Sequence, residues 1–490
     1  MIKLSDEEKI RLEKLKTIRA LGVDPYPAKS TRTRKIREVV EEFKELEKDG
    51  KKIILTGRLR SIRAHGALTF AHLEDESEKI QLALKRDEVG AKKYAFFGDL
   101  IDIGDFVEVR GGLFLTHKGE KTVLVKDFTL LSKSLTPLPE KWHGLTDTEI
   151  RFRKRYLDLI SNPEVKLIFA RRSAIVRAIR EFFDARGFLE VETPILQPIP
   201  GGANARPFVT RHNALDIDMY LRIAPELYLK RLIVGGMERV YEIARCFRNE
   251  GIDHLHNPEF TQIEFYQAYA DYEDLMKLTE ELLPYLAKKV LGGTKCVYDK
   301  NEIDFAPPYP RITFSDAIKK YAKIDIEEYP TRDQLAKKAK ALGVDVAKGD
   351  SHGRIMDELY KKFVRPNLIQ PTFIINHPPE LSPLAKKIPD SPKYVERFQL
   401  VLGGGIELCN AFSELNDPLE QEERFAEQEK ARESGDIEAQ RMDTDFLDAL
   451  RAGMPPTAGF GMGIDRLTMI LTNSHSVKEV ILFPTLKPEK

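Results

Sequence analysis

The spacing of hydrophobic and polar residues changes along the chain and predicts different structures in turn. In the first 50 residues, charged positions dominate between scattered leucines and isoleucines, which is typical of surface helices. Ser5 and Glu8 form a capping-box pattern that begins a helix, and Gly22 ends it. A second charged helix is predicted over residues 36–47. We therefore expect residues 1–50 to form a helical segment of their own.

Short runs of strand-forming residues follow and predict a small β-barrel over residues 51–135. The runs, which have glycines between or beside them, are Ile53–Leu55, Leu68–Phe70, Ile80–Leu82, Phe106–Val109 and Thr122–Val125. Five short strands within about eighty residues are typical of such a barrel. A helix is predicted to interrupt them over residues 87–97. Because Pro137 and Pro139 stiffen the chain, residues 136–150 are expected to be a linker.

The pattern from residue 151 to 490 mixes helices and strands and predicts one larger domain. Asn162, Pro163 and Glu164 are a cap, a first-turn proline and a first-turn acid, and they begin a long amphipathic helix. Further segments are read as strands near 188–192, 219–223, 239–248, 259–269 and 459–463, and as helices within 315–365 and from Asp465. The predicted fold class is α+β.

Composition then narrows the classes of function. Lys plus Arg and Asp plus Glu both number 78, so binding nucleic acid through bulk charge alone is disfavoured, whereas a local basic patch stays open. The three cysteines are not spaced for a disulfide framework or a zinc site, which fits a reducing compartment. No apolar stretch approaches a membrane span, and the N-terminus is charged too early for a signal peptide. We expect a cytoplasmic protein without a membrane partner.

The first candidate site is a loop between two predicted strands. Arg248 stands at one end and Phe260 at the other, with His256 between them. Arginine offers paired donors to a phosphate, and phenylalanine offers a face on which a base stacks. The alternative is an ordinary polar hairpin with Phe260 in the core. Spacing alone favours that alternative.

A second candidate is the strand with glycines at positions 459, 461 and 463. Alternate glycines leave one face of a strand open to the close approach of a ligand. Arg466 follows in the first turn of a helix, where free N–H groups also favour anions. Tight packing of the strand against its neighbours explains the glycines equally well.

The remaining candidates are carboxylates. In a strand, Glu414 shares a face with Asn410 and Phe412, whereas Glu407 lies on the opposite face unless a bulge intervenes. Paired carboxylates beside a phosphate site would hold Mg²⁺. A solvated acidic edge is the commoner reading of this run.

Three further residues suggest a pocket for an amine. Glu264 and Tyr266 share one strand face, and together with Glu226 they would suit a ligand that carries amino groups. A surface salt-bridge pair is the common alternative.

Taken together, these segments resemble the class II aminoacyl-tRNA synthetases. Residues 187–194, 247–260 and 461–466 resemble motifs 1, 2 and 3 of that family, in the right order. The runs Ile199–Ala203, Ile223–Tyr228, His256–Phe260 and Phe412–Asp417, and Lys141–Leu145 at the junction between domains, are most similar to the lysine-specific members. The resemblance covers nearly the whole chain.

The resemblance implies a fold, a reaction and partners. The fold is an N-terminal OB-fold anticodon-binding barrel joined to a class II antiparallel-sheet catalytic domain. The reaction is the ATP-dependent activation of L-lysine to lysyl-adenylate, followed by transfer of lysine to the 3′ end of tRNA(Lys) for protein synthesis. Mg²⁺ would assist, ATP would be the co-substrate, and motif 1 would build a homodimer.

The resemblance also implies roles for individual residues. Arg248 would bind the α-phosphate and Arg466 the γ-phosphate, as the catalytic residues. The ATP-binding set is Arg248, Asn249, Glu250, His256, Asn257, Phe260, Glu407, Leu408, Gly463, Asp465 and Arg466. The lysine-binding set is Gly202, Glu226, Glu264, Tyr266, Asn410 and Phe412. The Mg²⁺ ligands are Glu407 and Glu414, and the anticodon contacts are Arg63, Phe70, Gln81 and Glu120.

The chemistry agrees with these residue types. A lysine carboxylate is ionised at neutral pH, so it attacks the α-phosphorus without a general base. The protein must position the reactants and neutralise charge.

Three other functions agree less well with these residues. An aspartate- or asparagine-specific relative would need a cationic pocket in place of Glu264 and Tyr266. A protein-lysylating relative would lack the barrel. A non-catalytic nucleic-acid binder predicts losses at Arg248, Glu407, Glu414 or Arg466, and all four are intact. Leu255 and Ala67 stand where the family often has basic residues.

Overall fold

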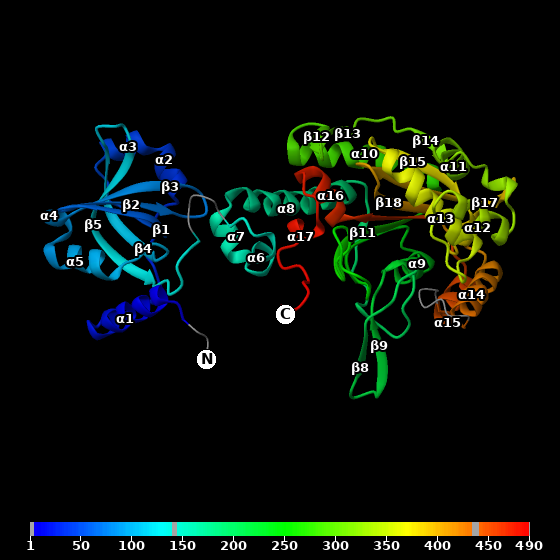
Figure 1. The fold of residues 1–490 in the computed structure, drawn as a ribbon, viewed down its shortest axis with the longest axis horizontal. Coiled ribbons are helices and arrows are strands. Elements are labelled where there is room, and N and C mark those ends of the chain that lie inside the picture. The colour runs from blue at the N-terminus through cyan, green and yellow to red at the C-terminus, as the bar shows by residue number, and fades with distance from the viewer. Residues whose placement is uncertain (1–3, 140–144, 434–440, 490) are drawn as a thin grey trace. The chain divides into compact units, whose positions relative to one another are not determined.

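The computed structural model describes residues 4–139, 145–433 and 441–489. The chain forms two compact units, Met1–Gly144 and Leu145–Lys490 (Figure 1). The predicted linker 136–150 and the junction run Lys141–Leu145 lie partly outside the described residues, because 140–144 are not described.

The first unit begins with helices that follow the predicted pattern. Helix α1 spans Asp6–Ala20, and the predicted capping box is confirmed: the Glu8 amide donates to Ser5 Oγ over 3.2 Å, and the Ser5 amide donates to Glu8 Oε2 over 2.8 Å. The second predicted helix is divided into α2 (Ile36–Glu41) and α3 (Phe43–Lys48). Apolar side chains of these helices pack against the barrel.

The predicted barrel is a closed sheet of five strands in the order β1-β2-β3-β5-β4. Its strands are β1 (Ile53–His65), β2 (Leu68–Glu74), β3 (Lys79–Lys85), β4 (Phe106–Leu115) and β5 (Lys121–Ser132). Only the pairing of β3 with β5 is parallel. The predicted interrupting helix is two helices, α4 (Arg86–Val89) and α5 (Ala91–Leu100), because Gly90 between them has φ of 86°.

The second unit is built on a largely antiparallel sheet of nine strands. The order is β14 (Arg311–Thr313), β15 (Thr372–His377), β17 (Ser391–Leu402), β18 (Ile406–Ser413), β19 (Thr457–Gly463), β11 (Glu259–Ala268), β10 (Arg239–Phe247) and β6 (Leu189–Glu190), with β16 (Lys387–Ile388) beside β17. Only the β14–β15 and β10–β6 pairings are parallel.

Helices pack on both faces of this sheet, and the site lies on one of them. Helices α8 (Pro163–Asp184), α10 (Tyr272–Leu291) and α16 (Ile464–Thr472) pack on the face that carries Phe265 and Phe460 (Figure 1). Because side chains alternate along a strand, Glu264 and Tyr266 of β11 point to the opposite face. Helices cover that opposite face only in part, and it holds the cavity described below.

Smaller elements surround the sheet. Predicted helices are confirmed within 315–365 and form their own core with β14 and β15. They are α11 (Phe314–Ala322), α12 (Arg332–Ala341) and α13 (His352–Leu359), with the short turns η1 (Ile326–Glu328), η2 (Tyr360–Val364), η3 (Arg365–Asn367) and η4 (Pro379–Leu381). The others are α6 (Thr148–Arg153), α7 (Arg155–Ser161), α9 (Glu226–Val234), α14 (Pro418–Glu433), α15 (Thr444–Ala452) and α17 (Val477–Val480), and the hairpin β12 (Lys295–Tyr298) with β13 (Asn301–Asp304).

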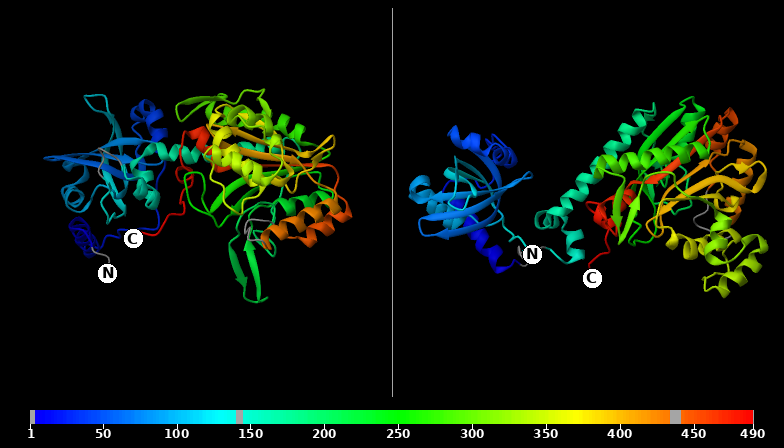
Figure 2. Two further views of the ribbon diagram at one scale, coloured as in Figure 1. Left: turned by 45° about the vertical axis from the view of Figure 1, so that its right-hand side comes forward. Right: turned by 90° about the horizontal axis from the view of Figure 1, so that it is seen from above.

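A separate three-stranded sheet follows motif 1. It contains β7 (Leu196–Gln197), β8 (Val209–His212) and β9 (Ile217–Leu221) in the order β7-β9-β8. Figures 1 and 2 show the β8–β9 hairpin projecting from the second unit. Among the described helices of both units, none is long and apolar enough to cross a membrane.

Candidate functional site

A cavity of about 360 Å³ opens on the face of the large sheet that carries Glu264 and Tyr266. It is lined by β11, β18 and β19, by the loop that follows β10, and by the first turn of α9. The structure brings nearly all the predicted ATP- and lysine-binding residues to this one cavity. These are Gly202, Glu226, Arg248, Glu250, His256, Asn257, Phe260, Glu264, Tyr266, Glu407, Leu408, Asn410, Phe412, Gly463, Asp465 and Arg466. Asn249 and Glu414 are not among the lining residues.

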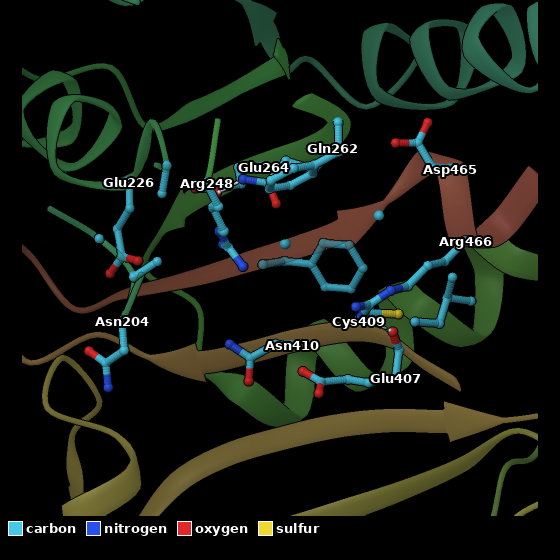
Figure 3. Close-up of a pocket in the computed structure, with 18 of the residues that line it drawn as sticks. Asn204, Glu226, Arg248, Gln262, Glu264, Glu407, Cys409, Asn410, Asp465 and Arg466 are labelled. Carbon is cyan, nitrogen blue, oxygen red and sulfur yellow. Dashed lines mark hydrogen bonds between the residues drawn. The ribbon is translucent and has the colours of Figure 1, made fainter. Parts of the chain in front are cut away.

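The cavity has two chemically different ends. Figure 3 shows Glu226 and Asn204 at one end and Arg466 with Asp465 at the other. Arg248 extends into the space between them. The first end is therefore acidic, and guanidinium groups lie toward the second. The acidic end suits a ligand with ammonium groups, and the guanidinium end suits a ligand with phosphates.

The guanidinium end is assembled from β10, β11 and α16. The Arg248 guanidinium carbon lies 5.0 Å from the centroid of the Phe260 ring. Arg466 donates from Nη1 to the backbone oxygen of Glu407 over 2.8 Å. Burial lowers the pKa of Arg466, and the Glu407 carboxylate works against that shift. Arg248 Nε is buried and donates to no atom of the described residues, so this cation is available for a ligand.

The loop between β10 and β11 is braced by residues near the C-terminus. Asn257 Oδ1 accepts a hydrogen bond from the Thr485 amide over 3.1 Å, and the Val477 amide donates to the His254 carbonyl over 2.9 Å. We call residues 477–485 the C-terminal segment. Buried Arg155 holds this segment by donating to three of its carbonyls, and it pairs with Asp158 over 2.6 Å.

Asp465, one of the predicted ATP-binding residues, is also occupied by bracing contacts. Its carboxylate pairs with Arg172 over 2.5 Å and accepts a hydrogen bond from the Thr261 amide over 3.0 Å. Asp465 thereby joins α8, β11 and α16 behind the loop. Its carboxylate is engaged in positioning the strands around the cavity.

The acidic end is a buried set of carboxylates beside a phenol. Glu264 accepts hydrogen bonds from Gln262 Nε2 over 2.5 Å and from the Tyr266 hydroxyl over 3.3 Å. Burial, and then the nearby Glu226 carboxylate, raise the pKa of Glu264 to about 8. Burial also raises the pKa of Tyr266, so its hydroxyl stays protonated. This end is poised to take up cations, because an arriving ammonium favours the ionised carboxylate.

Glu414 lies beside the acidic end. It is buried, and its carboxylate forms an ion pair with Lys230 of α9. Gly459 makes room for it, since a Cβ there would stand 2.1 Å from Glu414 Oε1 and 2.4 Å from the Tyr266 ring. Of the two predicted metal ligands, Glu407 thus lines the cavity and Glu414 is held by Lys230.

Glu407 reaches the cavity because β18 is irregular. Leu400 pairs with Cys409 but Val401 pairs with Glu407, so Leu408 is the extra residue of a bulge. The bulge lets Glu407 face the cavity together with Asn410 and Phe412. Within the described residues, no cluster of three or more histidine, cysteine or carboxylate side chains could hold a metal ion by itself.

Sequence reasoning missed several lining residues, of which Arg397 is the clearest. Its Nε donates to Asn410 Oδ1 over 2.7 Å, and its Nη1 donates to Ser382 Oγ over 2.7 Å. Arg397 thus positions Asn410 and the loop after η4. The available signal was an arginine in the mostly apolar end of β17. Gln262, Asn204 and Ser382 also line the cavity and carried no such signal.

The predicted anticodon residues gather on the outer surface of the barrel. Arg63 of β1 stands opposite Phe70 of β2, and Arg63 is exposed while Phe70 is half-buried. Gln81 donates from Nε2 to Glu120 Oε2 over 2.7 Å. Phe70 is half-buried and is not part of the barrel core formed by the described residues.

Two family models and many relatives match this chain. The family described as "tRNA synthetases class II (D, K and N)" matches residues 147–487, and the "OB-fold nucleic acid binding domain" matches residues 53–131. Proteins named lysine–tRNA ligase are 53% identical in Moorella thermoacetica, over 98% of each chain, and 53% identical in Roseiflexus castenholzii, over 100% of each. A third, from Carboxydothermus hydrogenoformans, is 51% identical over 99% of each chain.

Proposed function

Since the chain belongs to the class II aminoacyl-tRNA synthetases and is similar along its whole length to lysine–tRNA ligases, we propose that its cavity activates L-lysine with ATP. The activated lysine is then transferred to the 3′ end of tRNA(Lys) for protein synthesis. The observation that carries this proposal is the division of one cavity into an acidic end, with Glu226, Glu264 and Tyr266, and a guanidinium end, with Arg248 and Arg466.

The reaction needs alignment and charge neutralisation more than acid–base chemistry. The lysine carboxylate is ionised at neutral pH and attacks the α-phosphorus directly, and pyrophosphate leaves. Arg248, between the two ends, contacts the α-phosphate and stabilises the charge that develops there. Arg466 holds the γ-phosphate, and the adenine lies against Phe260. Glu226 receives the α-amino group, while Glu264 and Tyr266 grip the ε-ammonium.

Mg²⁺ is proposed as the metal cofactor, held by Glu407 and Glu414. Mg²⁺ is commonly bound through one or two carboxylates together with substrate phosphates, and Glu407 lines the cavity. The ion would neutralise phosphate charge and favour departure of pyrophosphate. Glu414 is also paired with Lys230, so its carboxylate would connect the ion to the acidic end.

The direct test is ATP–pyrophosphate exchange with each of the twenty amino acids, with Mg²⁺ present and tRNA absent. Exchange that depends on lysine alone supports the proposal. Exchange with aspartate or asparagine keeps the mechanism and overturns the substrate. No exchange with any amino acid favours a non-catalytic nucleic-acid binder.

The barrel is proposed to read the anticodon of tRNA(Lys). Phe70 stacks on a base, while Arg63, Gln81 and Glu120 contact the neighbouring nucleotides. We divide the chain into a helical segment (1–50), the barrel (51–135), a linker (136–150) and the catalytic domain (151–490). Limited proteolysis that cut first within 136–150 would support these boundaries.

A homodimer built on the motif 1 region is proposed, supported by apolar side chains that the single chain leaves exposed. They are Leu189, Ile195, Leu196, Val209 and Ile217. Light scattering on the eluted, active enzyme tests this, and a monomer would refute it. A cytoplasmic location is also proposed, because all three cysteines are free thiols. Cell fractionation tests that location.

A further inference from the structure

Lys230 is a buried cation directly behind the acidic end of the cavity. It lies one helical turn after Glu226 on α9, and its Nζ is 2.6 Å from Glu226 Oε1. The same ammonium pairs with Glu414. Its side chain has no exposed surface, and it does not line the cavity. Substrate would therefore meet the two carboxylates that Lys230 holds, and not Lys230 itself.

Aromatic rings complete the surroundings of this ammonium. The ring centroids of Tyr266, Phe412 and Phe446 lie 6.0, 5.5 and 5.7 Å from Lys230 Nζ. Tyr266 and Phe412 also line the cavity, so the cage and the cavity share a wall. Burial acts to lower the pKa of Lys230, but Glu226 and Glu414 outweigh it and raise that pKa. Lys230 is thus a fixed positive charge.

The carboxylates near this end suit a ligand with two ammonium groups. Glu226 and Glu414 pair with the Lys230 ammonium, and Glu226 and Glu264 both line the cavity. Lysine would bring its α- and ε-ammonium groups to these two carboxylates, and Arg248 would face its carboxylate. Without Lys230, Glu226 and Glu414 would lose the cation that holds them both.

We propose that Lys230 is a positioning residue that determines specificity: its ammonium orients Glu226 and Glu414 and sets the charge that the cavity presents to the amino acid. This proposal rests on the proposed function, because it takes lysine as the substrate. A buried lysine here does not make the site suitable for an acidic substrate, because two carboxylates already neutralise it.

The test uses the full chain and steady-state ATP–pyrophosphate exchange, with KM measured separately for lysine and ATP. Lysine-dependent exchange by the unaltered enzyme is established first, and its absence there would reject the proposed function independently of Lys230. In Lys230→Ala we expect the KM for lysine to rise at least about tenfold, from the loss of charged hydrogen bonds. The KM for ATP should stay within about twofold, because ATP binds at the other end.

Chemical rescue separates a charge role from a packing role. n-Propylammonium has the heavy atoms that Lys230→Ala removes, so adding it should lower the KM for lysine in this variant and not in the unaltered enzyme. Tetramethylammonium controls for ionic strength, because it has no N–H donor. An unchanged KM for lysine, or equal rises in both KM values without rescue by n-propylammonium, would overturn the proposal.

Two further variants keep the proposal testable if Lys230→Ala fails to fold. Lys230→Met keeps the apolar stem and removes the charge. The double variant Lys230→Met with Glu414→Gln removes both charges of one pair, so the fold should recover while Glu226 stays unoriented. A raised KM for lysine in the folded double variant supports the proposal, and a KM equal to that of the unaltered enzyme refutes it.

Discussion

Each unit of the molecule buries one lysine between two carboxylates, but the two clusters are completed differently. In the first unit, Lys133 pairs with Asp102 over 2.5 Å and with Asp105 over 2.8 Å. Asp105 also accepts hydrogen bonds from the amides of Asp102 and Ser134, and Asp102 pairs with Lys14. These carboxylates are fully satisfied within the barrel unit.

The cluster around Lys230 in the second unit is left incomplete. Apart from the ion pair with Lys230, neither oxygen of Glu414 accepts a hydrogen bond from the described residues. Glu226 and Glu264 open on the cavity. Since buried polar groups are normally satisfied, the difference separates a structural cluster from one that a ligand completes. A buried ion pair marks a site when it retains unsatisfied acceptors and borders a cavity.

Arg248→Ala is expected to have the largest effect on activity. Arg248 forms no ion pair with a carboxylate of the described residues and extends into the cavity. Arg248→Ala should reduce lysine-dependent exchange on the order of 10³-fold or more, since donors aimed at developing charge contribute at this scale. The midpoint of thermal unfolding should change little. Arg63→Ala on the exposed barrel face is the matched control and should leave exchange intact. Retained exchange in Arg248→Ala would contradict its role.

Lys133→Met tests the completed cluster. It leaves the buried Asp105 carboxylate without its cation, while Asp102 keeps only Lys14, so the free energy of unfolding should fall by about 3 kcal/mol. Urea unfolding measures this loss, and exchange assayed in the folded protein should keep its KM for lysine. A raised KM for lysine in Lys133→Met would remove the distinction between the two clusters.

Phe70→Ala tests whether the surface of the first unit binds tRNA. Loss of a stacked base should raise the KM for tRNA roughly tenfold in aminoacylation, because such stacking is worth about 1–3 kcal/mol. ATP–pyrophosphate exchange without tRNA should not change. Phe106→Ala removes another exposed barrel ring, which lies under Arg58, and is the control. Equal loss in both assays would exclude an anticodon role for Phe70.

The pKa of Glu264 predicts a pH dependence for the incomplete cluster. With a pKa of about 8, its carboxyl is protonated at neutral pH, and binding of an ammonium requires loss of that proton. The KM for lysine should therefore fall as pH rises toward 8, by at most about tenfold per pH unit, and level off above it. Glu264→Gln should abolish this dependence. A flat profile in the unaltered enzyme would show that the carboxyl is already ionised.

Much of the fold and site followed from local patterns in the sequence. The capping box at Ser5 predicted α1, and the alternation of Glu264 and Tyr266 placed both on the cavity face. Lys230 escaped this reasoning, because a carboxylate and a lysine four residues apart are typical of an exposed helix face. The packing of α15 and β18 over α9 buries it.

The face on which Glu407 lies could not be decided from the strand pattern. Period-two alternation puts Glu407 opposite Glu414 unless a bulge intervenes, and β18 does bulge at Leu408. A bulge adds a residue without a sequence pattern that predicts it here, so period-two reasoning fails at this point. Arg397 was missed for a related reason, since its contact with Asn410 on the neighbouring strand depends on the register of β17 and β18, which the bulge shifts.

The C-terminal segment is synthesised after the elements it holds in place. Arg155 and Asn257 both contact residues 477–485, which leave the ribosome after every strand of the large sheet. A chain that ended near residue 476 would keep the residues of the acidic end, but its loop between β10 and β11 would lack these contacts.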